Sequence, residues 1–184
     1  MPIKSSKRIK ITPNNALAQR VLPIVHAKQK ESNWCWAACF NMAFDYFHFD
    51  ISQCKIAGQY FSLRGDKQDC CKHPGICDNS ISDAWISDLY SFWNYRFDFH
   101  PNQITFNNIQ TTINHNKLIE VGLSWAGGGG HVALVNGWSD DTQDEVYVND
   151  PGSGNGPGLI NYTELQNAYG QGVWDATWDS IESK

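Results

Sequence analysis

The sequence lacks any apolar run that approaches the ~20 residues a membrane-spanning helix needs. It also has no excess of basic residues, since 14 Lys and Arg stand against 19 Asp and Glu and give a net charge of −5. This balance argues against a nucleic-acid-binding protein, which normally carries a basic stripe. The first ten residues lack the apolar segment of a secretory signal. Three explanations stay open: a signal was removed, export takes another route, or the protein stays inside the cell.

Cysteine is absent after position 77, whereas six cysteines lie between positions 35 and 77. Such clustering indicates disulfides or a metal site in the N-terminal half, beside at least one cysteine with another role. Hydrophobic residues make up 41% and charged residues 18% of the chain, as in globular proteins. The eight Trp, seven Tyr and nine Phe residues suit a protein with a cleft lined by large side chains.

Helical patterns fill the first half of the chain and strand patterns the second. Apolar residues recur at helical spacing over 35–47 and 80–95, and Ser32 and Asn33 are N-cap candidates for the first of these helices. Shorter helices are expected at 52–61, 106–116 and 163–169, and strands at 118–125, 131–138, 145–149 and 173–178. The glycine-rich stretch 152–158 predicts an irregular loop. This order predicts an α+β fold.

Cys35 is the strongest candidate for a reactive residue, because it lies in the first turn of a predicted helix. The positive end of the helix dipole favours a thiolate there, which makes the sulfur a nucleophile. A buried core cysteine is the alternative, and Cys39, one turn further on, fits that role better. Gln29 lies six residues before Cys35, and its amide can donate to an oxyanion together with the backbone N–H of the nucleophile.

Two further candidate groups lie in the strand-rich half. His131 follows four glycines and opens an apolar strand, where an imidazole can face a cleft. Asn149 and Asp150 end the next strand, and either side chain can orient a histidine. If the two strands are antiparallel neighbours, a hydrogen bond between His131 and Asp150 is geometrically feasible. Strand alternation places Asn149 and Asp150 on opposite faces, so only one of them can reach His131.

Four short segments together resemble the papain-like cysteine peptidases: Gln29, the box 33–38 around Cys35, Gly130-His131, and Asn149-Asp150-Pro151. The chain order Gln, Cys, His, Asp is that of the superfamily, as is the interval of six residues between the first two. Two compact bacterial types are most similar. Avirulence-effector peptidases share the Trp-Cys-Trp-Ala-Ala box, and bacteriocin-leader peptidases share the Asp-Pro ending.

The resemblance implies a thiol peptidase that needs no cofactor and no metal. It also implies a papain-like α+β fold, with an N-terminal helical lobe (about 21–105), a C-terminal antiparallel β lobe (about 106–184) and the active-site cleft between them. Residues 1–20 are then a tail or linker, and 21–184 form one catalytic domain.

By the same resemblance, Cys35 is the nucleophile, and His131 is the base that becomes the acid for the leaving amine. Asp150 orients His131, and Gln29 completes the oxyanion hole with the Cys35 amide. Papain itself has an Asn-Ser-Trp motif at the third position, whereas here Asn149 directly precedes the aspartate. We expect Asp150 to serve, as in the compact bacterial types.

The remaining cysteines have a separate role. Two disulfides would brace the helical lobe, as the resemblance suggests for exported members, with the pairing left open among Cys54, Cys70, Cys71 and Cys77. Zinc bound by Cys70, Cys71, His73 and Cys77 is a competing interpretation, although adjacent cysteines seldom both ligate one tetrahedral metal. Free thiols are the third interpretation of these cysteines. Cys39 is expected to stay buried and unpaired.

Two other functional hypotheses use the same residues. The triad also supports deamidation or acyl transfer, so a bacterial effector or toxin delivered into a target cell is one alternative. A catalytically silent secreted binding module is the other, but it would not need all four catalytic residue types. The expected partners are a protein or peptide substrate and an inhibitor or immunity protein, with no nucleic acid and no membrane span. The expected location is secreted or exported.

Overall fold

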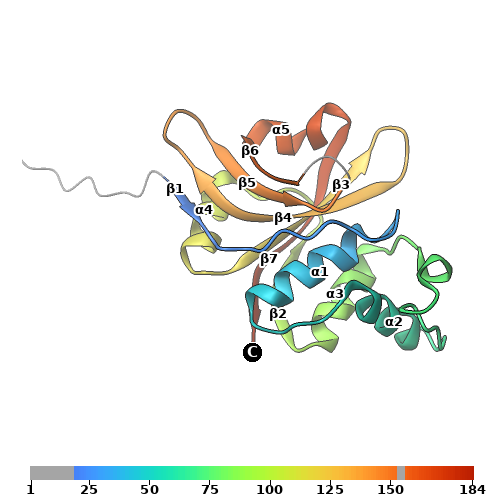
Figure 1. The fold of residues 1–184 in the computed structure, drawn as a ribbon. Coiled ribbons are helices and arrows are strands. Elements are labelled where there is room, and N and C mark those ends of the chain that lie inside the picture. The colour runs from blue at the N-terminus through green and yellow to red at the C-terminus, as the bar shows by residue number, and fades with distance from the viewer. Residues whose placement is uncertain (1–18, 153–155) are drawn as a thin grey trace, which may run out of the picture.

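The computed structural model describes residues 19–152 and 156–184, and these form a seven-stranded antiparallel sheet with helices packed against it. The larger helices are α1 (Cys35–Tyr46), α2 (Gln53–Leu63) and α3 (Asp83–Phe92). In Figure 1 they lie together on one side of the sheet, with α1 next to β4. The α+β prediction is confirmed. None of the helices in the described ranges is long and apolar enough to cross a bilayer.

The sheet follows the order β2-β7-β3-β4-β5-β6, and β1 pairs with the end of β4. Its strands are β1 (Gln19–Val21), β2 (Tyr95–His100), β3 (Leu118–Trp125), β4 (Gly130–Ser139), β5 (Glu145–Asp150), β6 (Gly156–Asn161) and β7 (Gly172–Ser183). The short elements are α4 (Phe106–Asn114), α5 (Tyr162–Gln166), η1 (Pro74–Cys77) and η2 (Ala168–Gly170). The C-terminal strand β7 lies between β2 and β3, so the end of the chain is built into the sheet.

Three local predictions are wrong. Trp34 occupies the N-cap of α1 and no side chain caps the helix, so neither Ser32 nor Asn33 has that role. The stretch 156–158, expected in an irregular loop, belongs to β6, because β5 supplies hydrogen-bond partners along its edge. The helix expected over 80–95 ends at Phe92, and Tyr95 instead begins β2, a strand that was not predicted and that pairs with β7.

The predicted tail falls only partly within the described residues. Residues 1–18 lie outside them, as do 153–155 of the expected loop. Gln19 and Arg20 pair with β4 as part of β1.

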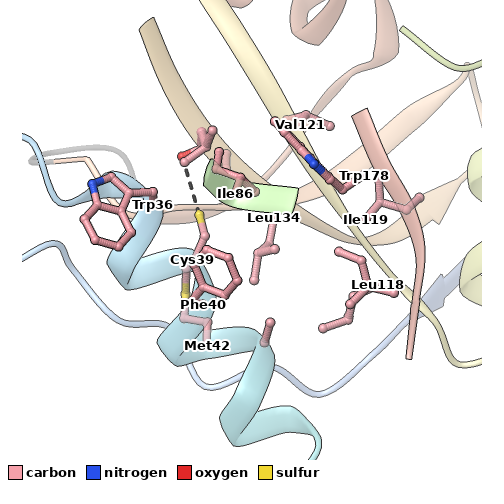
Figure 2. Close-up of a cluster of buried hydrophobic side chains, with 14 of the residues drawn as sticks. Trp36, Cys39, Phe40, Met42, Ile86, Leu118, Ile119, Val121, Leu134 and Trp178 are labelled. Carbon is pink, nitrogen blue, oxygen red and sulfur yellow. Dashed lines mark hydrogen bonds between the residues drawn. The ribbon is translucent and has the colours of Figure 1, made fainter. Parts of the chain in front are cut away.

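The core lies between α1 and the sheet. Figure 2 shows Cys39 and Phe40 of α1 on the side of the helix that faces Leu134 and Trp178 of the sheet. The Cys39 thiol donates a hydrogen bond to the Val132 carbonyl at 3.5 Å. Close packing of this layer holds α1 against β4, the strand that carries His131.

Four of the six cysteines form disulfides: Cys54 pairs with Cys71, and Cys70 pairs with Cys77. The prediction of two disulfides is confirmed. The zinc alternative is wrong, because cysteines joined in disulfides cannot bind zinc as thiolates. Cys39 is buried and unpaired, as expected, and Cys35 is the second free cysteine among the described residues.

Glu120 in β3 is a fully buried carboxyl group. The Tyr90 hydroxyl donates a hydrogen bond to its Oε2 at 2.5 Å, and its Oε1 has no partner among the described residues. Burial raises the pKa of Glu120 to about 8, against the opposing effect of the Tyr90 hydrogen bond, because an ion in an apolar core loses its hydration. The carboxyl group is therefore mostly protonated in the folded protein at neutral pH.

This carboxyl group makes stability depend on pH. The unfolded chain releases the Glu120 proton near pH 4.5 and the folded chain only near pH 8, so this contribution is greatest below pH 4.5 and is lost as pH rises through 8. Glu120→Gln should remove a slope of at most about 1.4 kcal/mol per pH unit in the free energy of unfolding. Urea denaturation from pH 5 to 8 measures it, and equal slopes in the two proteins would contradict this account.

Candidate active site

Cys35 is the first residue of α1, and its two tryptophan neighbours anchor the start of that helix. The Trp34 indole N–H donates to the Cys77 carbonyl at 2.8 Å, and the Trp36 indole N–H donates to the Asn79 carbonyl at 2.9 Å. Cys77 is itself joined to Cys70 by a disulfide. The segment 77–79 therefore holds the start of the helix, and with it the thiol.

The backbone at the start of α1 is free to bind an anion. No side chain caps the helix, and within the described ranges no hydrogen bond involves the Cys35 N–H. The first N–H groups of any helix lack intrahelical partners and carry the positive end of its dipole. Cys35 thus combines a sulfur and an unused N–H donor at one position.

His131 and Asp150 are brought together by a β-hairpin. Strands β4 and β5 are antiparallel neighbours, with Leu134 opposite Asn149. His131 Nε2 lies 2.7 Å from Asp150 Oδ1, and the two side chains are only 11% and 4% exposed. Oδ1 also accepts a hydrogen bond from the Gly152 N–H at 2.7 Å. With Nε2 engaged by the carboxylate, Nδ1 is the ring nitrogen left for the Cys35 sulfur.

Two kinds of contact favour a charged His131. Burial lowers its pKa, but hydrogen bonding to Asp150 and to Cys35, and the charges of both groups, outweigh burial and raise the pKa to about 9. The Trp125 ring is stacked on the imidazole, with 5.9 Å between ring centroids and 21° between the planes. An aromatic face attracts a cation, so this contact also favours the imidazolium.

Asn149 points elsewhere. Its Nδ2 donates to Asn136 Oδ1 at 2.9 Å, inside the sheet. Strand alternation places the two neighbouring residues on opposite faces, and the residue on the side of His131 is Asp150.

Gln29 lies near the site, but its amide is turned into its own loop. Its Nε2 donates to the Glu31 carbonyl at 2.9 Å and to the Ser32 carbonyl at 2.6 Å, which uses both amide hydrogens. Its backbone N–H donates to the Pro151 carbonyl at 2.9 Å, so the loop is tied to the end of β5. Reaching an oxyanion at Cys35 requires the side chain to give up at least one of the two carbonyls.

Two hollows border His131. A pocket of about 220 Å³ is lined by Cys35 and His131 together with Asp83 and Asp175. Burial, followed by repulsion from Asp175, raises the pKa of Asp83. A shallower hollow of about 470 Å³ is lined by His131 and Gln29 among others.

The family model described as the Peptidase_C39 like family matches residues 21–181. The chain belongs to this family. It is therefore a cysteine peptidase with a papain-like fold, as its sequence predicts. No curated protein is similar enough to match it.

Solved structures show the same fold. The peptidase domain of Streptococcus ComA, a bifunctional ABC transporter involved in a quorum-sensing pathway, has a TM-score of 0.58 and 10% identity, covering 86% of this chain and 98% of that one. A C39-like peptidase from Bacillus anthracis has a TM-score of 0.58 and 11% identity, covering 89% and 96%. A double glycine motif protease from an AMS/PCAT transporter, solved with the leader peptide, has a TM-score of 0.51 and 10% identity, covering 86% and 93%.

Two structural features of this C39-like peptidase escaped sequence reasoning. One is the stacking of Trp125 on His131. The β3–β4 hairpin, in which Ser124 pairs with Gly130, is the signal that would have placed it there. The segment 77–79 gives no local signal, because its contacts with Trp34 and Trp36 span about forty residues of chain.

Thiol alkylation should separate the two free cysteines of this peptidase. Burial raises the pKa of Cys39 well above its usual range, and its side chain is 0% exposed, so it should resist iodoacetamide at pH 7. Cys35 should be modified selectively in the folded protein, and Cys35→Ala should remove the label. Peptide mass mapping without reduction measures this, and comparable labelling of Cys39 would refute it.

Proposed function

We propose that this peptidase hydrolyses peptide bonds through a triad of Cys35, His131 and Asp150. The observation that carries the proposal is the 2.7 Å contact between His131 Nε2 and Asp150, beside a pocket that Cys35 lines. The preference for Asp150 over Asn149 rests on the same contact. Residues 21–184 act as the single catalytic domain in this proposal, and 1–20 as a tail or linker.

In the first half of the reaction, the Cys35 proton passes to His131, whose raised pKa keeps the imidazolium populated at neutral pH. The thiolate attacks the carbonyl carbon of the peptide bond, and the carbonyl π electrons move onto oxygen. As the tetrahedral intermediate collapses, the C–N bond breaks and His131 gives its proton to the leaving amine. A thioester to Cys35 remains.

In the second half, water attacks the thioester while neutral His131 accepts its proton. The C–S bond then breaks, the thiolate leaves, and the carboxylic acid is released. Asp150 keeps the imidazole in one orientation throughout and balances its positive charge.

The oxyanion formed in each half needs donors. The Cys35 N–H supplies one, and its lack of another partner among the described residues supports this role. We assign the second donor to Gln29 Nε2, which must exchange the carbonyl of Glu31 or Ser32 for the oxyanion. Substrate binding in the hollow beside Gln29 is the event that would drive this exchange.

The substrate class follows from the site and from its structural relatives. The two hollows that border His131 suit a peptide, and one structural neighbour is a double glycine motif protease solved with a leader peptide. The two disulfides favour an oxidising environment outside the cytosol, so we place the activity there. Delivery into a target cell and control by an inhibitor or immunity protein are extensions of this proposal.

Cys35→Ala should lower cleavage by about 10⁴-fold or more, because no other group at the site can form the thioester. Cys39→Ala is the matched control, since it removes a sulfur one helical turn away that faces the core. Suitable probes are casein peptides and a synthetic peptide with a central Gly-Gly, followed by mass spectrometry.

Product masses also separate the alternative reactions. Hydrolysis adds one water across the cleaved bond, deamidation exchanges an amide for an acid, and acyl transfer joins two molecules. Full activity of Cys35→Ala would refute the proposal, and so would a product that is only deamidated or joined.

A further inference from the structure

Tyr169 occupies a strained turn between α5 and β7. It belongs to η2, where φ is 43° at Ala168 and 56° at Tyr169. Left-handed backbone is costly for residues with a Cβ, and unusual for a bulky aromatic residue. Such strain persists only where the surroundings enforce it, and it is concentrated at functional sites.

The turn is held by neighbouring backbone. The Gly170 N–H donates to the Asn167 carbonyl at 2.8 Å, and the Gln171 N–H donates to the Ala168 carbonyl at 3.0 Å. The Gln171 carbonyl in turn accepts from the Ala126 N–H at 2.9 Å, directly after β3. These bonds fix the direction in which the Tyr169 side chain leaves the chain.

That direction is toward the triad. Tyr169 lines the hollow of about 470 Å³ that His131 also lines, and a second hollow of about 260 Å³ that Asp150 lines. Its hydroxyl oxygen is buried and makes no hydrogen bond of regular geometry within the described residues. Asp150 faces Tyr169 across the hollow that both line, and after burial its charge and hydrogen bonding also raise the pKa of Tyr169. A neutral hydroxyl and a buried carboxylate therefore border the same hollow.

We propose that Tyr169 is a positioning residue whose hydroxyl donates a hydrogen bond to Asp150 and so keeps that carboxylate against His131. Asp150 Oδ1 already serves His131 and Gly152, and a further donor restricts rotation of the carboxyl group. The strained turn holds this donor in place. The inference rests on the triad of the proposed function.

The hydrogen bond also adjusts the charge that His131 meets. A donor on Asp150 takes up part of the negative charge, so the carboxylate stabilises the imidazolium less strongly. The other titratable neighbours are Cys35 for His131, and Cys39 and Glu164 for Tyr169. A moderated imidazolium gives its proton more readily to the leaving amine.

Nuclear magnetic resonance titration of His131 in protein labelled with ¹³C-histidine tests this inference without a substrate. Tyr169→Phe removes the donor and keeps the ring, and the pKa of His131 should rise above its wild-type value. Tyr162→Phe is the matched control, because the Tyr162 hydroxyl donates to the Ile104 carbonyl at 2.7 Å, away from the triad. The control should leave the His131 titration unchanged.

Enzyme kinetics provide a second test of the role of Tyr169. With Tyr169→Phe, kcat should fall about threefold to tenfold at unchanged KM, as for the loss of one hydrogen bond, and the alkaline limb of the kcat profile should move to higher pH. Replacing Tyr169 by 3-fluorotyrosine, which is a stronger donor and keeps the fold, should move the His131 pKa the opposite way.

An unchanged His131 titration in both Tyr169 variants would overturn the inference, and so would the same shift in Tyr162→Phe. If the wild-type protein cleaves no peptide, the proposed function fails on its own. The titrations still decide the role of Tyr169, because they need no turnover.

Discussion

The site depends on one hydrogen bond, between the His131 imidazole and the Asp150 carboxylate. The bond exists because β4 and β5 form a hairpin, which brings the entry of one strand and the end of the other to the same edge of the sheet. It holds the ring in one orientation, leaves Nδ1 for the sulfur and favours a charged imidazole although the side chain is largely buried. Trp125 stacks on the ring of His131, and Tyr169 lines a hollow that Asp150 also lines.

The sulfur is held by a separate set of contacts. The core on α1 sets the position of the helix axis, and the two indole hydrogen bonds to the segment 77–79 set its first turn. The Cys70–Cys77 disulfide constrains that segment, and the segment in turn contacts Trp34 and Trp36 on either side of Cys35. Cys35 and His131 thus come from opposite sides of one packed interface, so a stable interface keeps the two side chains accurately placed.

The positions of Cys35, His131 and Asp150 in the fold were predictable, because they depend on residue type and on the local sequence pattern. Cys35 stands at the start of a mostly apolar helix, His131 lies at the beginning of β4, and Asp150 ends β5, the next strand of the hairpin. Features that depend on contacts between residues far apart in the sequence, or on the local path of a loop, were not predictable. Strand β6 forms because the free edge of β5 supplies hydrogen-bond partners. The disulfide pairing depends on which cysteines the folded chain brings together. The Gln29 amide turns toward carbonyl groups of its own loop. Tyr169 carries no sequence signal, since its place depends on a backbone conformation that its residue type disfavours.

The most direct test of the account is the protonation state of His131 in the resting enzyme. Titration of its ¹³C-labelled ring by nuclear magnetic resonance should give a pKa of about 9, and Asp150→Asn should lower it markedly because the balancing charge is lost. A wild-type pKa at or below the ordinary 6.5, or a value unaffected by Asp150→Asn, would contradict the claim that this carboxylate keeps the imidazole charged beside Cys35.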